Sequence, residues 1–242
     1  MRRVACYKTE SELCKDFIEW AKPQGWTAYA ETAGWDIVLV HSNGWQIGVQ
    51  AKLHPNIKVL SQTVTACDFT WTDKPIQGPD FRAVLVPKSN PDFEGLARFA
   101  GVTVFKAWPR WSDSKKDFNP NIDSDFTIAD DKQWTAEQRI QLPKHIPDVI
   151  AGSPCPLQLT EWKLKALRIT ALLEVRGWVT RADFKNLNLS WQRWPVNRWL
   201  KCLHLSTRYG RGDRLDFDKQ HPTVFEEIKK EVMAELATGG AA

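Results

Sequence analysis

The chain has 242 residues, of which 43% are hydrophobic and 26% charged, so two domains with buried cores are feasible. Its formal net charge is +4, and no apolar run is long enough to cross a membrane, so no membrane association is expected. No long apolar stretch follows the N-terminal segment, which predicts a chain without a signal peptide. The five cysteines lack metal-ligand spacing and indicate a reduced, cytoplasmic protein: Cys6, Cys14, Cys67, Cys155 and Cys202.

Helix and strand patterns alternate through the first 110 residues. An amphipathic helix is predicted over residues 9–21, because Leu13, Phe17 and Trp20 recur on one helical face. The later elements are expected in this order: a strand over 26–33, a two-stranded ribbon over 34–52, a helix over 57–69, a strand over 81–86, a helix over 93–99 and a strand over 102–106. This order predicts a mixed α/β domain.

The ribbon over residues 34–52 carries the candidate chemistry. Side chains alternate between the two faces of a strand, so the length of the loop decides which residues meet. A two-residue loop sends Gln50 and Lys52 to the face opposite Asp36. A three-residue loop with Gly44 in the left-handed conformation pairs Asp36 with Gln50 and places Lys52 on the same face. An active site here requires that loop, or a bulge elsewhere in the ribbon.

Asp36 on the second strand and Gln50-Ala51-Lys52 on the third resemble the PD-(D/E)XK nuclease superfamily. The signature of that family is an acid on the second strand followed by (D/E)xK on the third. Glutamine in place of the second acid is a variant found in Mrr-like restriction enzymes and in the endonuclease subunit of some heteromeric transposases. The resemblance covers residues 1–110 and implies a restriction-endonuclease-like mixed sheet flanked by helices.

The resemblance also implies a nuclease that depends on Mg²⁺ or Mn²⁺. Asp36, the Gln50 amide oxygen and the Ala51 carbonyl oxygen are the expected ligands, since Mg²⁺ takes oxygen ligands and keeps several waters. Lys52 is expected to orient the attacking water or to offset the negative charge that develops at phosphorus.

A further acid is expected because Gln50 contributes no charge. Glu12 on the first helix and Glu31 on the first strand are the candidates, and family members often draw an acid from that helix. Glu12 also completes a capping box with Thr9 that needs no metal, and Glu31 equally fits an ordinary exposed strand position. Both interpretations of each glutamate stay open at this level.

A domain boundary is expected between residues 111 and 155. Residues 112–131 are rich in Asp, Asn, Ser and Lys and indicate a long loop or an insertion over the first domain.

The two parts of the chain differ in their balance of basic and acidic residues. Residues 1–128 carry 15 basic and 15 acidic residues, whereas residues 160–214 carry 12 and 4. That local net charge of +8 favours a polyanionic partner, because neutralised phosphates release counterions.

The C-terminal segment predicts three helices followed by a basic β-hairpin. The helices are expected over residues 160–175, over residues 180–187, and from Ser190 or Pro195 to about Lys201, where Arg193, Asn197 and Arg198 also lie. The hairpin is expected to pair residues 205–209 with 214–217 around a tip at 210–213, and a last amphipathic helix covers 223–236.

Three helices and a basic hairpin resemble a winged helix-turn-helix. In that family the third helix enters the major groove and the wing contacts the DNA backbone. Groove contacts are therefore expected from Arg193, Asn197, Arg198 and Lys201, and phosphate contacts from Arg208, Arg211 and Arg214. A winged helix that contacts another protein is the alternative interpretation.

These features predict a nuclease-like domain over residues 1–110, a linker or insertion over 111–154, and a mainly α, winged-helix-like DNA-binding domain over 155–242. The expected function is metal-dependent hydrolysis of DNA phosphodiesters, as in transposition, restriction or phage DNA processing. The expected partners are DNA and either a second copy of the chain or a recombination or transposition protein. The alternatives are a non-catalytic DNA-binding or assembly factor that retains the nuclease fold, and an interaction protein with an acidic partner.

Overall fold

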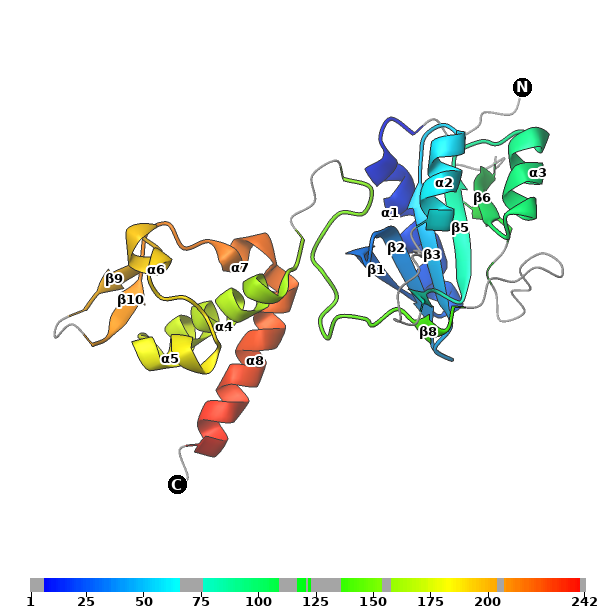
Figure 1. Cartoon of the computed structure of the whole chain (residues 1–242). Helices are drawn as coiled ribbons and strands as arrows, with labels where there is room; N and C mark the ends of the chain where they lie inside the picture. The colour runs from blue at the N-terminus through cyan, green and yellow to red at the C-terminus, as the bar shows by residue number, and fades with distance from the viewer. Residues whose placement is uncertain are drawn as a thin grey trace. The chain divides into compact units, whose positions relative to one another are not determined.

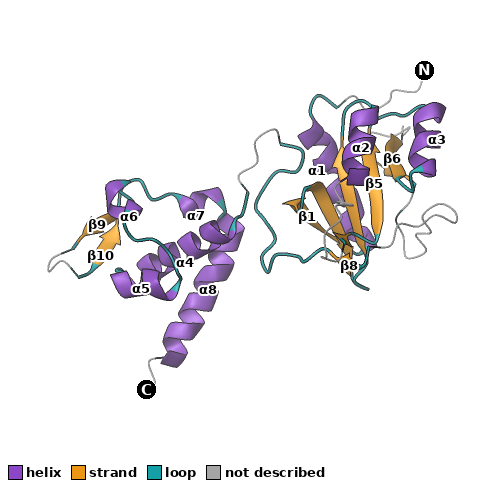
Figure 2. Ribbon diagram, in the orientation of Figure 1, coloured by secondary structure: helices purple, strands orange, loops and turns teal. Residues whose placement is uncertain are grey.

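The computed structural model describes the residues 7–65, 76–108, 117–120, 122, 136–153, 158–203 and 207–239. The chain divides into two compact units. The first unit comprises Met1–Ile146 and Ile150–Pro156, and the second comprises Pro147–Val149 and Leu157–Ala242. Figure 1 labels their helices and strands, and Figure 2 distinguishes the sheet-containing first unit from the mainly helical second unit.

The first unit is built around a six-stranded mixed sheet with the strand order β1-β2-β3-β5-β6-β7. The first three strands form an antiparallel meander, β5 and β6 continue the sheet in parallel with β3, and β7 closes it antiparallel to β6. The elements are, in chain order, α1 (Glu10–Ala21), η1 (Lys22–Gln24), β1 (Trp26–Thr32), β2 (Trp35–His41), β3 (Gln46–Ala51), α2 (Ile57–Thr65), β4 (Gln77–Gly78), β5 (Phe81–Val86), α3 (Pro91–Phe99), β6 (Thr103–Trp108), β7 (Asp117–Asn119) and β8 (Gln138–Arg139).

The strands carry apolar side chains on both faces of the sheet, and helices cover both faces. Val84 and Val86 of β5 pack with residues of α2 and α3, whereas alternate residues of a strand face the other way. On the other face, Phe17 of α1 lies 5.0 Å from Phe105 and 5.2 Å from Phe118 between ring centroids. The sheet is therefore the middle layer of a three-layer unit, which confirms the expected restriction-endonuclease-like fold class.

The order of elements expected over the first 110 residues is present, with small changes at the element ends. Thr9 caps α1, because its hydroxyl accepts a hydrogen bond from the Glu12 backbone N–H at 3.2 Å. The last four residues of the helix expected over 57–69 lie outside the described residues, in which α2 runs to Thr65.

Residues 136–146 and 150–153, which fall in the segment expected to be a linker or insertion, belong to the first unit. β8 pairs with β4 in a small parallel ribbon. The side chain of Gln46 donates to the carbonyl of Ile140 and accepts from its N–H, both at 2.9 Å. These reciprocal bonds fasten the segment to the start of β3.

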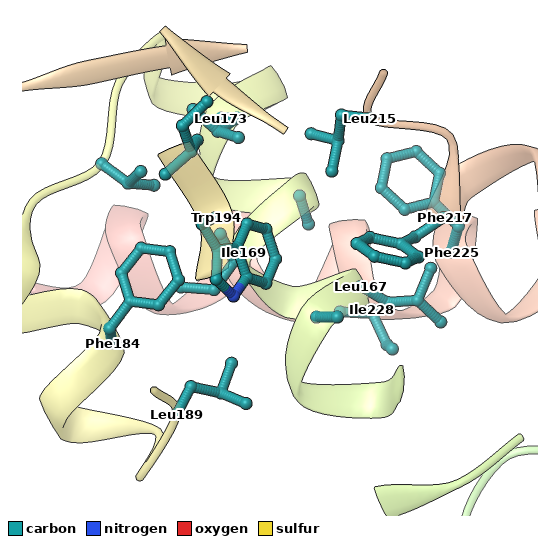
Figure 3. Close-up of a cluster of buried hydrophobic side chains, with 14 of the residues drawn as sticks. Leu167, Ile169, Leu173, Phe184, Leu189, Trp194, Leu215, Phe217, Phe225 and Ile228 are labelled. Carbon is teal, nitrogen blue, oxygen red and sulfur yellow. The ribbon is translucent and has the colours of Figure 1, made fainter. Parts of the chain in front are cut away.

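The second unit is mainly helical, with α4 and α8 in contact along their lengths. Its core contains Leu167, Phe184, Trp194 and Phe225, which come from four different helices (Figure 3). The elements are α4 (Glu161–Arg176), α5 (Arg181–Asn186), α6 (Arg193–Val196), β9 (Leu200–Cys202), β10 (Tyr209–Arg211), α7 (Phe217–Gln220) and α8 (Pro222–Gly239). In the described part of the chain, no helix combines the length and apolarity needed to span a membrane.

The first two helices of this unit form as expected, but the predicted third helix and hairpin are wrong in extent. α6 is a single turn over Arg193–Val196, and β9 follows where the helix was expected to continue. The observed ribbon pairs Leu200–Cys202 with Tyr209–Arg211, whereas the predicted partner strand over 214–217 is a loop and the start of α7. Part of the other predicted strand, residues 204–206, lies outside the described residues.

The error came from two glycines that were interpreted as a hairpin tip. A Cβ atom on Gly212 would lie 2.1 Å from the carbonyl oxygen of Arg198, and one on Gly210 would lie 3.0 Å from Leu203 Cδ2. Gly212 requires glycine because the backbone of Arg198 and Trp199 approaches closely, not because the chain reverses there, and Gly210 faces a tight contact with a leucine side chain.

Candidate functional site

The β2–β3 turn has the three-residue loop that the candidate site requires. Ile37 pairs with Val49 and Val40 with Gln46, and one more step of this register places Asp36 opposite Gln50. Gly44 has φ +89°, the left-handed conformation expected at the last loop position.

Asp36 lies at the start of β2, partly buried, and is fixed from the neighbouring strand. Its Oδ2 accepts a hydrogen bond from the Ala51 backbone N–H at 2.7 Å. Burial raises the pKa of the Asp36 carboxyl above its ordinary value, and Glu10 adds to this, whereas the Ala51 N–H and Lys52 act in the opposite direction. An acid with a raised pKa beside a cation is typical of a functional site.

Lys52, directly after β3, pairs with a glutamate that the sequence analysis did not select. Its Nζ lies 2.7 Å from Oε2 of Glu10 in the first turn of α1, and both side chains are about one-third exposed. Lys52 and Glu10 both act electrostatically on the pKa of Asp36, so the three groups lie close together.

Gln50 is 8% exposed, and its amide nitrogen is anchored. Nε2 donates to the carbonyl oxygen of Gly34, in the β1–β2 turn, at 2.7 Å. Because the nitrogen is used in this bond, the amide oxygen is the atom suited to a cation. Metal coordination by the Gln50 oxygen stays a prediction.

Glu31 lies near the end of β1 and joins the same cluster. It has φ +48°, which is unusual for a residue with a side chain. Burial and Asp36 raise its pKa, whereas backbone N–H groups of Gly152 and Ser153, together with Lys52, act to lower it. The Gly152 N–H donates to Oε1 at 2.9 Å, so a segment distant in sequence holds this carboxylate.

Glu12 does not join the cluster. Its Oε2 accepts a hydrogen bond from the Lys8 N–H at 2.8 Å, and its own N–H donates to Thr9. Thr9 therefore caps the helix as the sequence suggested, whereas the Glu12 carboxylate, on an exposed face of α1, bonds the Lys8 N–H in place of the Thr9 N–H of a capping box.

Helical spacing is the signal that distinguishes Glu10 from Glu12. Glu10 precedes Leu13 by three residues and Cys14 by four, so it shares their inward face, whereas Glu12 does not. The buried Cys14 thiol lies close to these acids. Burial is the largest cause of its raised pKa, and the charges of Asp36, Glu10 and Glu31 each raise it further.

The cluster is not a preformed cage of acids. Among the described residues, no three Asp, Glu, His or Cys side chains are already placed to hold a metal ion together. The Asp36 bond to Ala51 and the ion pair between Lys52 and Glu10 occupy groups that a cation would use. The donor set still fits Mg²⁺, because it consists of carboxylate, amide and carbonyl oxygens.

The predicted DNA contacts of the second unit fall into two groups. Arg198 pairs with Asp213, and Arg211 donates to both carboxylate oxygens of Asp218 at 2.7 and 2.8 Å, so their charges are compensated within the unit. The others lie in α6 and directly after it, in β9, directly before β10 and in the turn after β10: Arg193, Asn197, Lys201, Arg208 and Arg214.

Comparison with known proteins adds little. No protein-family model matches the chain, and no curated protein matches it. A solved structure to which the chain is similar is the crystal structure of a repair endonuclease from Pyrococcus abyssi, with a TM-score of 0.32 and 14% identity. The match covers 44% of this chain and 50% of that one. A likeness of this size carries no argument about function.

Proposed function

We propose that the chain is a metal-dependent DNA endonuclease whose active site lies at the ends of β2 and β3. One observation carries this proposal: Asp36, Gln50 and Lys52 come together from the two strands, and the carboxylates of Glu10 and Glu31 join them from α1 and β1. An acid, an amide oxygen and a lysine beside further carboxylates suit the hydrolysis of a phosphodiester.

Asp36, the Gln50 amide oxygen and the Ala51 carbonyl oxygen would hold Mg²⁺ or Mn²⁺, with Glu10 or Glu31 as the further acid. A divalent cation at this place supplies Lewis-acid polarisation of the phosphodiester and lowers the pKa of a water molecule. The ammonium group of Lys52 offsets the negative charge that develops on the phosphate oxygens. Glu10 orients this ammonium group through their ion pair.

The second unit would place the DNA. Its order of helix, single bridge, two short helices and a β-ribbon resembles a winged helix-turn-helix, with Val179–Tyr209 as the bridge that joins the ribbon to the segment after the first helix. The ribbon and its surroundings carry several cations, which suits contact with phosphates.

A plasmid-nicking assay tests the enzyme. Supercoiled DNA incubated with the protein and Mg²⁺ or Mn²⁺ should be nicked, and Asp36→Asn or Lys52→Ala should lower the rate by roughly 10²- to 10³-fold, as when a charge-stabilising group is removed. Lys106→Ala is the matched control, because Lys106 pairs with Glu94 at 2.8 Å with similar exposure in the same unit. Cleavage that survives Asp36→Asn would contradict the proposal.

A paired comparison on α1 tests the choice of acid. Glu10→Gln should impair nicking, whereas Glu12→Gln, two residues along, should leave it within a few-fold, because Glu12 only caps the helix. The reverse order of effects would show that the carboxylate from α1 is assigned to the wrong residue.

A second function has support from one observation, namely that the acids are engaged with protein groups and form no preformed metal cage in the described residues. A DNA-binding factor that retains the nuclease fold without cutting would have this property. Cation-independent DNA binding without nicking in either metal would favour it.

A further inference from the structure

The arginines of the second unit differ in whether an acid compensates their charge. Arg198 and Arg211 form ion pairs with acids, so their charge is compensated. Arg181 and Arg208 are exposed and form no ion pair with any acid in the described residues, and each lies over a tryptophan ring instead.

The first stack lies beside the Val179–Tyr209 bridge. The guanidinium carbon of Arg208 is 4.2 Å from the centre of the Trp178 ring. Backbone N–H groups of Val179 and Tyr209 donate to each other's carbonyls at 2.9 Å, which fixes the two chain segments in register. Since Val179 and Tyr209 are buried, their neighbours Trp178 and Arg208 face outward.

Arg176 strengthens the position of the Trp178 ring. Its guanidinium carbon lies 4.0 Å from the ring centre, its Nε donates to the Trp178 carbonyl at 2.9 Å, and its Nη2 donates to Asp183 at 2.6 Å. Asp183 compensates the charge of Arg176, so this residue acts as a fixed support, whereas Arg208 keeps its charge.

The second stack contacts the same bridge through the ring of Tyr209. Arg181, the first residue of α5, has its guanidinium carbon 5.6 Å from the centre of the Trp191 ring. Trp191 in turn lies 4.2 Å from the ring of Tyr209, the residue after Arg208. Each of the two exposed arginines is therefore held on a tryptophan, and the Val179–Tyr209 bridge joins the segments that carry them.

We propose that Arg181 and Arg208, each stacked on a tryptophan beside the Val179–Tyr209 bridge, hold the phosphate backbone of duplex DNA. This rests on the proposed function, since it assigns the surface on which the second unit receives the substrate. A stacked guanidinium keeps its N–H edge available for phosphate oxygens, and stacking removes conformational freedom that binding would otherwise cost. The tryptophans thus hold both guanidinium groups in place to bind phosphates, without contacts to the bases.

The test measures the affinity of the full chain for fluorescently labelled duplex DNA over a range of salt concentrations. The double variant Arg181→Gln/Arg208→Gln should lower the slope of log affinity against log salt by about 2, because each phosphate contact contributes about 0.9. The loss should be the same on two unrelated sequences, since phosphates carry no sequence information. Arg168→Gln/Lys230→Gln, which removes two charges from α4 and α8, should leave the slope unchanged.

Trp178→Leu tests the aromatic support with every charge retained. It should weaken binding by about 2- to 5-fold, as expected from the loss of an exposed cation–π contact. Thermal unfolding of each variant, followed by circular dichroism, shows whether the unit still folds. If the wild type binds DNA and the double variant has the same salt slope, Arg181 and Arg208 are not the phosphate contacts, but the proposed DNA binding stands. If the wild type binds no duplex even at low salt, the phosphate contacts and the proposed DNA function are both wrong.

Discussion

At the scale of single residues, close contacts explain positions that composition does not. Gly48 in β3 lies beneath the Trp35 ring, so that an added Cβ would lie 2.5 Å from Trp35 Cδ2 and 2.8 Å from Pro79 Cγ. Trp35 is 2% exposed and directly precedes Asp36. The packing of one glycine against one indole therefore holds the start of the strand that carries the central acid.

Gly48→Ala should destabilise the first unit by about 1–3 kcal/mol, because the core has no room for the added methyl group. The measurement is urea unfolding followed by circular dichroism. Gly95→Ala is the control: no atom lies within 4 Å of its added Cβ, and α3 should gain about 0.5–1 kcal/mol from the better helix former. Equal effects of the two substitutions would show that the close approach to Trp35 is not the cause.

His221 is a second residue whose environment sets its behaviour. It is 1% exposed, and neither ring nitrogen has a hydrogen-bond partner among the described residues. Burial lowers the pKa of His221 first and the nearby Lys163 lowers it further, against an opposing effect of Asp148. The imidazole is therefore favoured in its neutral form.

The free energy of unfolding of the second unit should fall as the pH drops below 6.5, the ordinary pKa. Below that pH the unfolded chain binds a proton that the folded chain takes up only at lower pH, and the stability difference is complete once the pH is below the folded-state pKa. His221→Leu should remove this part of the pH dependence, measured as urea midpoints between pH 7.5 and 4.5. If the urea midpoint of that variant falls below pH 6.5 as it does in the wild type, His221 is not the origin of the pH dependence.

At the scale of elements, a short segment holds parts of the candidate site together. The N–H of Gly152 donates to Glu31 at 2.9 Å, and its carbonyl accepts from the Ser11 hydroxyl at 3.1 Å. Residues 151–153 thus join α1, which carries Glu10, to the end of β1. Gly152 has φ +69°, and a Cβ there would lie 2.9 Å from Cys14 Sγ.

Gly152→Ala should displace this segment and destabilise the first unit by about 1–3 kcal/mol, from the close contact together with the left-handed backbone. Urea unfolding again provides the measurement. Gly34→Ala isolates the backbone contribution, because Gly34 has φ +82° with no atom within 4 Å of the added Cβ. If the two variants lose the same stability, the contact with Cys14 contributes nothing.

At the scale of the whole molecule, the division of the chain does not follow a single cut. Residues Pro147–Val149 belong to the second unit although residues on both sides of them belong to the first. Asp148 accounts for this, because its Oδ2 accepts a hydrogen bond from the Val224 N–H at 2.9 Å. A carboxylate 76 residues away therefore caps the first turn of α8.

A fragment of residues 144–242 should consequently be more stable than one of residues 158–242, by about 0.5–2 kcal/mol, the usual contribution of a helix cap. Thermal unfolding of the two fragments provides the comparison. Asp148→Ala in the longer fragment should abolish the difference. A difference that persists in this variant would mean that other residues of the extension stabilise the unit.

Local patterns in the sequence were sufficient for much of this molecule. The element order of the first unit and the caps at Thr9, Thr160 and Thr180 follow from neighbours within a few residues. The length of the loop between β2 and β3 was left open by the sequence, and the strand register decided it. Periodicity and turn chemistry act at that range, so they can be read without coordinates.

Only the tertiary structure showed the contacts between distant segments. It paired Glu10 with Lys52, placed Gly152 against Glu31, and brought Gly212 against the backbone of Arg198, where a longer third helix was expected. It also showed that some arginines of the basic segment pair with acids, whereas others stack on tryptophan rings. The physical reason is that contacts such as Lys52–Glu10 and Gly152–Glu31 join residues 42 and 121 positions apart, and no local preference encodes such a meeting.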